Sequence, residues 1–117
     1  MSQRARRVGE MIHKEISTLL VNGLKDPRVG FVTITAVDVT PDLHLARVYY
    51  SVIGDEKARK ETEAGLMSSA SYIRQHLGSR LRLKFTPEIL FHYDESVDYA
   101  NRIEGLLREI KQEDSND

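Results

Sequence analysis

Four cationic side chains follow a run of small residues in a stretch of the chain that holds no carboxylate. Between Ala64 and Pro87 the sequence has no Asp or Glu. The stretch contains the small-residue run Ser68-Ser69-Ala70-Ser71 and then the cations Arg74, Arg80, Arg82 and Lys84. Arginine and lysine bind phosphates through charge-assisted hydrogen bonds, and small residues permit a ligand to approach closely. The pattern predicts a site for a nucleic-acid backbone.

A helix with an interruption is the element predicted to position these groups. Apolar residues recur at steps of three or four from Leu66 to Leu77, which is the spacing of one helix face. Serine is a poor helix-interior residue and a good N-cap. The small-residue run therefore predicts a helix that ends and restarts, or bends sharply, rather than a straight rod. A restarting helix would also offer free N–H groups to an anion.

No other group of side chains indicates catalysis or metal binding. The P-loop, G-x-G-x-x-G, H-E-x-x-H and nucleophile-elbow motifs are absent from the sequence. The histidines are His13, His44, His76 and His92, which lie in four different predicted elements without ligand spacing. Asp38 and Asp42 flank a predicted hairpin turn, and turn chemistry explains both. We therefore expect a protein that is not an enzyme and needs no metal or cofactor.

Length and composition indicate a single globular domain. The chain has 117 residues, of which 40% are hydrophobic and 30% are charged, as is ordinary for such a domain. No apolar run approaches the roughly 20 residues that span a bilayer, and we expect no signal peptide. The sequence has no cysteine, which excludes disulfides and thiolate zinc sites. We expect a cytoplasmic protein that does not bind membranes.

The formal net charge of −1 hides an asymmetry along the chain. Residues 1–93 hold 14 Lys and Arg against 10 Asp and Glu, a net +4, whereas residues 94–117 hold 3 against 8, a net −5. A basic body with an acidic end fits an anionic ligand at one place and a solvated tail at another. Ordinary drift of surface charge explains the asymmetry equally well. We expect a domain over 1–111 and a disordered acidic tail over 112–117.

The first half of the chain predicts a helix followed by a β-hairpin. Residues 2–22 carry apolar side chains at helical spacing. A Pro- and Gly-containing turn follows, and it holds the cations Lys25 and Arg28. Residues 31–39 and 43–52 are rich in β-branched and aromatic residues, and their short connection predicts an antiparallel pair.

The second half predicts helices over 56–67 and 71–79, a third strand over 88–93 and a last helix. Between the second and third of these, residues 80–85 alternate charged and apolar side chains. That alternation indicates either an extended segment or the end of the helix. The last helix has an apolar stripe at Tyr99, Ile103, Leu106 and Ile110. We expect this stripe to pack on the domain, with docking on a partner as the alternative.

The order of elements predicts the α+β class. The order is helix, strand, strand, helix, kink, helix, strand, with a C-terminal helix at the end. We expect the third strand to join the hairpin in one three-stranded sheet, with helices covering one face. This order is KH-like, although the GXXG loop with which KH modules clamp single-stranded RNA is absent.

Several of these stretches together resemble one bacterial protein family. The stretches are KEI at 14–16, LKDPRVGFVTIT at 24–35, DLHLARVYYSV at 42–52 and SASYIRQHLGSRLRLKFTPEILFHYDES at 69–96. Over most of residues 4–110 the chain is similar to ribosome-binding factor A, a family that helps to mature the small ribosomal subunit. The matching stretches are too long, and too well ordered, for chance similarity.

The resemblance implies a type II KH fold in which an interhelical kink, typically Ala-x-Gly, replaces the GXXG loop. The matching positions are Ser69, Ala70 and Ser71, which are small but lack the conformational freedom of glycine. The resemblance also implies that the chain binds the small ribosomal subunit and its ribosomal RNA during late assembly. Support of growth in the cold and the absence of a catalytic residue or cofactor are further implications.

The hypothesis that explains these observations together is that the chain is a monomeric, non-catalytic RNA-binding assembly factor. Its predicted RNA contacts are Lys25, Arg28, Ser69, Ala70, Ser71, Arg74, Arg80, Arg82 and Lys84. One rival is a protein-interaction module that docks through the C-terminal helix or the open face of the sheet. A second rival is a small enzyme, which would need convergent polar groups in a pocket.

Overall fold

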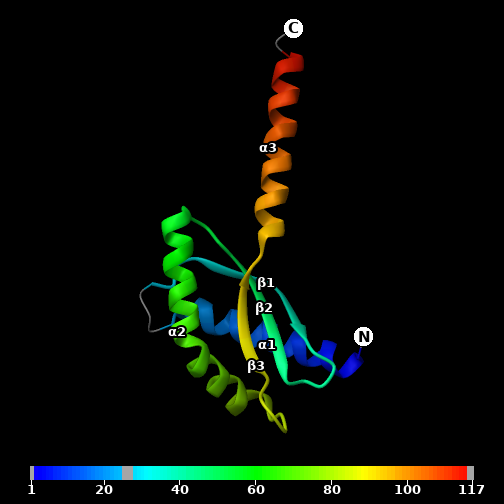
Figure 1. Cartoon of the computed structure of the whole chain (residues 1–117), viewed down its shortest axis with the longest axis vertical. Coiled ribbons are helices and arrows are strands. Elements are labelled where there is room, and N and C mark those ends of the chain that lie inside the picture. The colour runs from blue at the N-terminus through cyan, green and yellow to red at the C-terminus, as the bar shows by residue number, and fades with distance from the viewer. Residues whose placement is uncertain (1, 25–27, 116–117) are drawn as a thin grey trace.

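The structure, a computed structural model, describes residues 2–24 and 28–115 (Figure 1). Its elements follow the predicted order. They are the helix α1 (Gln3–Asn22), the strands β1 (Val32–Val39) and β2 (Leu45–Val52), the helix α2 (Glu56–Leu81), the strand β3 (Glu88–Tyr93) and the helix α3 (Glu95–Ser115). The predicted α+β class is confirmed.

The three strands form one mixed sheet in the order β1-β2-β3. β1 and β2 pair antiparallel, as the short connection between them predicted, whereas β3 pairs with β2 in parallel. A parallel pair needs a crossover connection, and α2 with the segment after it provides that crossover. The segment over 82–87 therefore lies at the end of the sheet where β2 begins, and α3 leaves from the opposite end (Figure 1).

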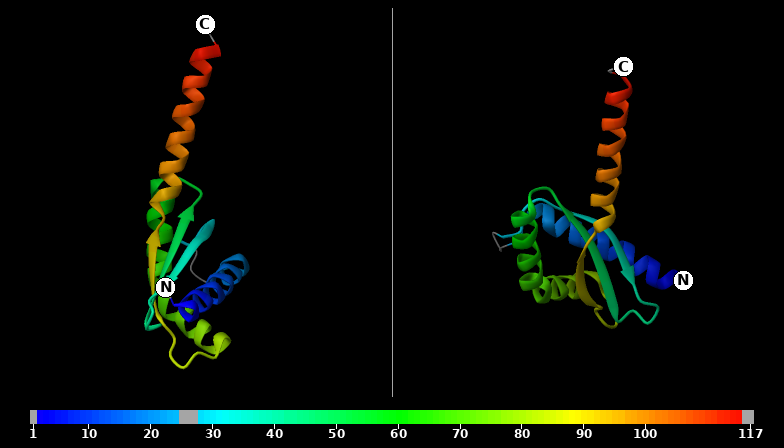
Figure 2. Two further views of the ribbon diagram at one scale, coloured as in Figure 1. Left: turned by 90° about the vertical axis from the view of Figure 1, so that its right-hand side faces the viewer. Right: turned by 45° about the horizontal axis from the view of Figure 1, so that its top comes forward.

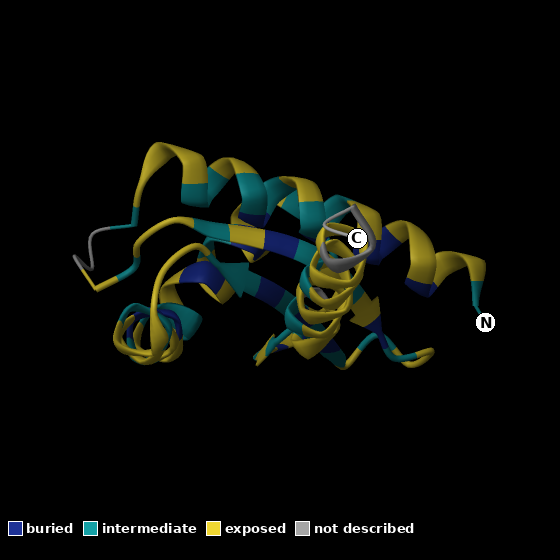
Figure 3. Cartoon of the chain, turned by 90° about the horizontal axis from the view of Figure 1, so that it is seen from above, coloured by how far each residue is buried: buried dark blue, intermediate teal, exposed yellow. Residues whose placement is uncertain are grey.

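One face of the sheet forms the core together with α1 and part of α2. Alternate side chains of β2 point into this core, and Ala46, Val48 and Tyr50 are almost fully buried. Ile12 and Ile16 of α1 have no exposed surface. Figure 2 shows α1 on one side of the sheet, and Figure 3 shows the buried positions gathered between the layers. No described helix covers the opposite face of the sheet.

The middle of α2 bends without a break. All residues from Glu56 to Leu81 are helical, yet Figure 2 shows the helix changing direction near its middle. The predicted bend is thus confirmed, while the alternative of a helix that ends and restarts is wrong, and no free N–H groups are offered there. A buried stripe runs across the bend, because Leu66, Ile73 and Leu77 all have no exposed surface.

The alternating residues 80–85 do not form a strand. Arg80 and Leu81 end α2, which is the second of the two predicted outcomes, and Arg82 caps the helix in the left-handed conformation with φ of 48°. Leu81 and Leu83 then pack against the core as half-buried side chains. The backbone turn at Arg82 lets the chain leave the helix while these two leucines stay on the apolar side.

The last helix projects from the body instead of packing on it (Figures 1 and 2). The prediction that its apolar stripe would pack on the domain is therefore wrong. α3 also continues through Ser115, so the helix extends beyond Gln112, where the tail was predicted to begin. Residues 116–117 lie outside the described part of the chain. That residues 1–111 fold as the independent unit stays a prediction.

Candidate nucleic-acid interface

An open groove lies between the C-terminal half of α2 and the segment that leads to β3. Its volume is about 490 Å³. It is lined by Ser71, Arg74, Gln75, Gly78, Lys84, Phe85 and Thr86. None of these lining residues is a carboxylate. The groove therefore combines two cations with hydroxyl and amide groups and one aromatic ring.

Helical spacing brings the α2 residues of this groove to one face. Ser71 is followed at steps of three, four and seven by Arg74, Gln75 and Gly78, which is the repeat of a helix surface. A side chain at Gly78 would crowd the neighbouring segment, since a Cβ there would lie 2.8 Å from Thr86 Oγ1. Glycine at this position lets the two walls of the groove approach each other.

Arg74 connects the two walls directly. Its Nη2 donates a hydrogen bond to the carbonyl oxygen of Thr86 at 3.0 Å. A guanidinium has five N–H donors, so donors remain for a ligand while this one holds the segment. Lys84 stands on the other wall, with its Nζ 5.7 Å from the centre of the Phe85 ring.

Phe85 is a component that the sequence reasoning missed. The side chain is 64% exposed, and its ring lies 6.2 Å from that of His44, centre to centre. An exposed ring next to cations is a stacking platform for bases of single-stranded nucleic acid. The signal was present in the alternating run, where an aromatic residue follows Lys84, but the run was interpreted only through its charges.

The bend of α2 holds a second part of the predicted site. Arg28 Nη2 donates a hydrogen bond to Ser68 Oγ at 2.9 Å. The segment after Arg28 lies close to α2 at Gly65, where an added Cβ would be 2.6 Å from Val29 Cγ2. Of the three kink positions, Ser69 and Ala70 are half-buried and only Ser71 is exposed. Lys25 lies outside the described residues.

Arg80 points away from the groove, toward α1. Its Nε lies 3.6 Å from Glu15 Oε2, and the same carboxylate oxygen lies 3.7 Å from His76 Nε2. The helical phase explains this position, because Arg80 comes seven residues after the buried Ile73 and so falls on the same side of α2. The structure thus brings Ser71, Arg74 and Lys84 together and leaves Arg80 with a carboxylate. Arg82 is exposed at the end of the helix.

The described residues contain neither a metal-binding cluster nor a membrane span. Among the side chains that the structure describes, which leave out those of residues 97 and 113–115, no three or more of His, Cys, Asp or Glu form a cluster suited to a metal ion. In the same part of the chain no helix is long and apolar enough to span a bilayer. The groove is shallow, polar and cationic, which suits a phosphate backbone better than a small apolar substrate.

Comparison with known proteins gives a consistent picture. The sequence model of ribosome-binding factor A matches residues 4–107. A ribosome-binding factor A from Trichlorobacter lovleyi is 57% identical over 108 residues, which cover 92% of this chain and 88% of that protein. One from Geobacter sulfurreducens is 50% identical over 117 residues, covering 100% of this chain and 99% of that one.

A solved structure shares the fold. The crystal structure of ribosome-binding factor A from Thermus thermophilus superposes with a TM-score of 0.65 at 19% identity, covering 76% of this chain and 94% of the other. The family model and these two relatives match almost the whole chain, so the similarity lies in the sequence as well as in the fold. This chain belongs to the ribosome-binding factor A family.

Proposed function

We propose that this chain binds the small ribosomal subunit through ribosomal RNA and assists late maturation of that subunit and of its RNA. It acts as a cytoplasmic monomer, without catalysis and without a cofactor. The contacts are the cations Lys25, Arg28, Arg74, Arg80, Arg82 and Lys84 and the small residues Ser69, Ala70 and Ser71. Arg74 and Lys84 carry the largest share, because they face one groove with Ser71.

The observation that carries the proposal is the pairing of that groove with family membership. Two cations, two hydroxyls and an exposed aromatic ring line one surface that no carboxylate shares. Phosphate contacts supply most of the affinity of such a surface, and stacking on Phe85 would add about 1–3 kcal/mol per base. A relative from Thermus thermophilus, 20% identical, has been fitted as a homology model into the cryo-EM map of a 30S complex.

The direct test is co-sedimentation with purified small ribosomal subunits. The double variant Arg74→Glu/Lys84→Glu reverses both groove charges and is expected to weaken binding at least about tenfold. The matched control is Lys14→Glu/Lys57→Glu, which makes the same change of charge at two exposed positions outside the groove. The control should bind nearly as well as the original chain. If the groove variant and the control variant lose the same affinity for the subunit, the loss comes from the overall change of charge, and the groove is not the binding site.

The maturation step has its own test in cells. A strain without the gene is complemented with the original chain, with the groove variant or with the control variant, and is grown at low temperature. Precursor small-subunit RNA is measured by primer extension. We expect precursor to accumulate with the groove variant and to be processed with the control. If the precursor RNA is fully processed in the strain with the groove variant, maturation does not depend on the groove.

A further inference from the structure

Apolar packing does not set the direction of α3. The exposed fractions are between 40% and 63% for its large apolar side chains Tyr99, Ile103, Leu106, Leu107 and Ile110. No described residue of α3 belongs to the hydrophobic core or packs against it as a half-buried side chain. Few buried apolar contacts are typical of segments that move. The direction of α3 therefore depends on polar contacts at its base.

The first attachment of α3 is at Asp94, directly before the helix. The backbone N–H of Asp94 donates to the carbonyl oxygen of Tyr50 at 2.7 Å, and Thr35 Oγ1 donates to Asp94 Oδ2 at 2.6 Å. The other carboxylate oxygen of Asp94 accepts a hydrogen bond from the backbone N–H of Ser96 at 3.0 Å. These contacts join the start of α3 to the sheet at one place. A single point of attachment forms a pivot but leaves the direction of a rod free.

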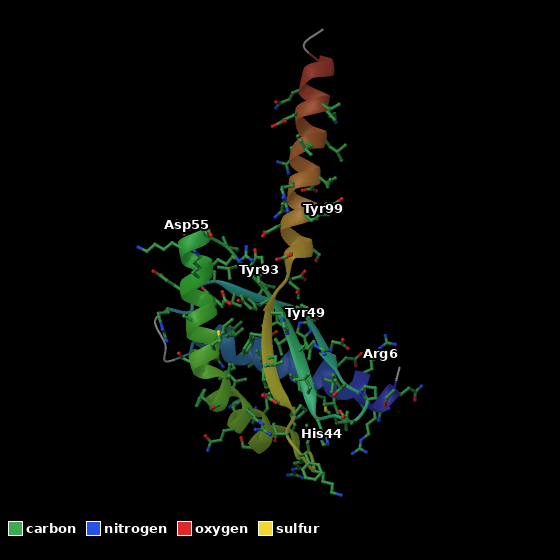
Figure 4. All side chains as sticks on the ribbon, viewed as in Figure 1. Arg6, His44, Tyr49, Asp55, Tyr93 and Tyr99 are labelled. Atoms are coloured by element: carbon green, nitrogen blue, oxygen red, sulfur yellow. The ribbon has the colours of Figure 1, made fainter. Side chains whose placement is uncertain are left out.

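A second attachment lies about one helical turn further along, at Asp98. The hydroxyl of Tyr93 donates a hydrogen bond to Asp98 Oδ1 at 2.9 Å, and Arg59 Nη1 lies 3.7 Å from Asp98 Oδ2. The guanidinium carbon of Arg59 is also 3.5 Å from the centre of the Tyr93 ring. In Figure 4, Tyr93 lies where β3 passes into α3. One residue from each of α2, β3 and α3 thus contacts the other two.

The protonation state of Tyr93 suits its contact with Asp98. Burial first, and then the hydrogen bond to Asp98, raise the pKa of Tyr93 above its ordinary value of 10.0. The hydroxyl therefore keeps its proton at neutral pH and can donate it to the Asp98 carboxylate.

The ion pair at Asp98 is partly open to water. The exposed fraction of the side chain is 38% for Arg59 and 43% for Asp98. Ion pairs and cation–π contacts at such exposure are individually weak, and salt screens the ion pair. These contacts can therefore open while the core of the domain stays folded.

We propose that Arg59, Tyr93 and Asp98 form a latch that sets the direction of α3. When the latch opens, α3 swivels about Asp94 as an intact helix, because the backbone hydrogen bonds of the helix do not pass through the latch. Ionic strength shifts the balance, since salt weakens the attraction between Arg59 and Asp98. The inference does not rest on the proposed RNA binding, because none of the latch residues lines the groove.

The distance between two spin labels tests the latch. The sequence has no cysteine, so Lys14→Cys in α1 and Glu109→Cys in α3, both at exposed positions, give one labelled pair in the full chain. Double electron–electron resonance measures the distribution of distances between the two labels. In this labelled parent chain we expect one narrow distribution at low salt. A broad distribution in the parent chain would overturn the proposal, because α3 would then have no fixed direction.

A variant of Arg59 opens the latch and a neighbouring variant controls for charge. Arg59→Gln removes the guanidinium and is expected to broaden the distribution, with distances that the parent chain does not show. The matched control is Lys60→Gln, which removes the same charge from the next residue of α2. Lys60 lies 3.5 Å from Glu56 of the same helix, so this variant should keep the narrow distribution. No broadening in Arg59→Gln, or the same broadening in both variants, would overturn the latch.

Salt and helix content complete the test. Added potassium chloride should broaden the distribution of the parent chain and change that of Arg59→Gln much less, since the ion pair is already absent there. This titration leaves the latch residues unchanged, so it decides the proposal even if Arg59→Gln does not fold. A parent distribution that stays narrow at high salt would overturn the proposal. Circular dichroism should give the parent chain and Arg59→Gln the same helix content, whereas a lower content in Arg59→Gln would mean that α3 melts and does not swivel.

Discussion

Arg74 Nη2 donates a hydrogen bond to the carbonyl oxygen of Thr86 at 3.0 Å. One cation of α2 thereby holds the segment that carries the other cation of the groove, Lys84. The contact ties the backbone next to Lys84 to α2 beside Arg74, so both cations belong to one connected part of the molecule. Their combined removal should affect RNA binding more than the removal of two isolated surface cations.

The salt dependence of RNA binding measures this directly. Each phosphate contact adds roughly 0.7–0.9 to the slope of log K against log salt. Arg74→Ala/Lys84→Ala is expected to make the slope shallower by about 1.4 with a single-stranded fragment of ribosomal RNA, since each contact to a single strand contributes about 0.7. Lys14→Ala/Lys57→Ala should leave the slope unchanged. An unchanged slope in the groove variant would show that neither cation meets a phosphate.

Arg80 should matter less than Arg74, because Glu15 lies 3.6 Å from it. Arg80→Ala is expected to weaken RNA binding by about threefold or less, and, as for other exposed ion pairs, to change stability by no more than about 1 kcal/mol. Glu15→Gln removes the carboxylate and should make the effect of Arg80→Ala larger. A larger effect of Arg80→Ala than of Arg74→Ala in the original chain would place the binding surface nearer α1.

Gly65 should not tolerate a side chain. A Cβ there would lie 2.6 Å from Val29 Cγ2 and 3.3 Å from the Val29 backbone nitrogen, so the segment after Arg28 must move. Alanine favours the helix by up to about 1 kcal/mol, but overpacking costs about 1–3 kcal/mol. We expect Gly65→Ala to lower the free energy of unfolding in urea. Gly105→Ala is the control, since nothing lies within 4 Å of a Cβ there, and it should raise helix content.

Asp94 gives the fold a specific sensitivity to acid. Hydrogen bonds from Ser96 and then from Thr35 hold the pKa of the Asp94 carboxyl below its ordinary value, and Thr35 Oγ1 donates to Oδ2 at 2.6 Å. A folded-state pKa that is lowered contributes stability above the unfolded pKa, and this contribution is lost as the pH falls through the folded one.

The matching experiment compares the chain with Thr35→Val at several pH values. Near neutral pH the variant should be less stable by about 1 kcal/mol, the typical value of one hydrogen bond. Below the folded pKa of Asp94 this difference should shrink, because the protonated carboxyl is a poorer acceptor. Denaturation curves at pH 7 and at a series of falling pH values below the ordinary carboxyl pKa of 3.8 measure it. A constant difference at all of these values would show that Thr35 acts through packing instead.

The fold was largely readable from the sequence because its signals are local. Apolar spacing predicted α1, and the β-branched runs predicted the hairpin. The small-residue run of α2 was only half informative, since serine propensity favoured a restart while the buried stripe from Leu66 to Leu77 keeps the helix continuous. Tertiary packing overrides propensity in this way. The parallel direction of β3 has no signal in any single segment.

The site was less predictable, because it depends on helical phase and on where α2 ends. The sequence shows Arg74 and Arg80 as members of one cationic stretch. Six residues of helix separate them by nearly two turns and place them on different flanks. The sequence also could not predict whether the apolar stripe of α3 packs on the domain. An amphipathic pattern indicates that one helix face is apolar, but not what covers that face.

The direction of β3 also decides where the groove and α3 lie relative to each other. Since β3 runs parallel to β2, the chain enters β3 at the end of the sheet that carries the groove and leaves it at the opposite end, where α3 begins (Figure 1). An RNA bound in the groove, as proposed, would therefore leave α3 pointing away from the contact. The helix after β3 has 21 residues and is about 30 Å long, so anything that α3 contacts would lie on the side of the molecule opposite the groove.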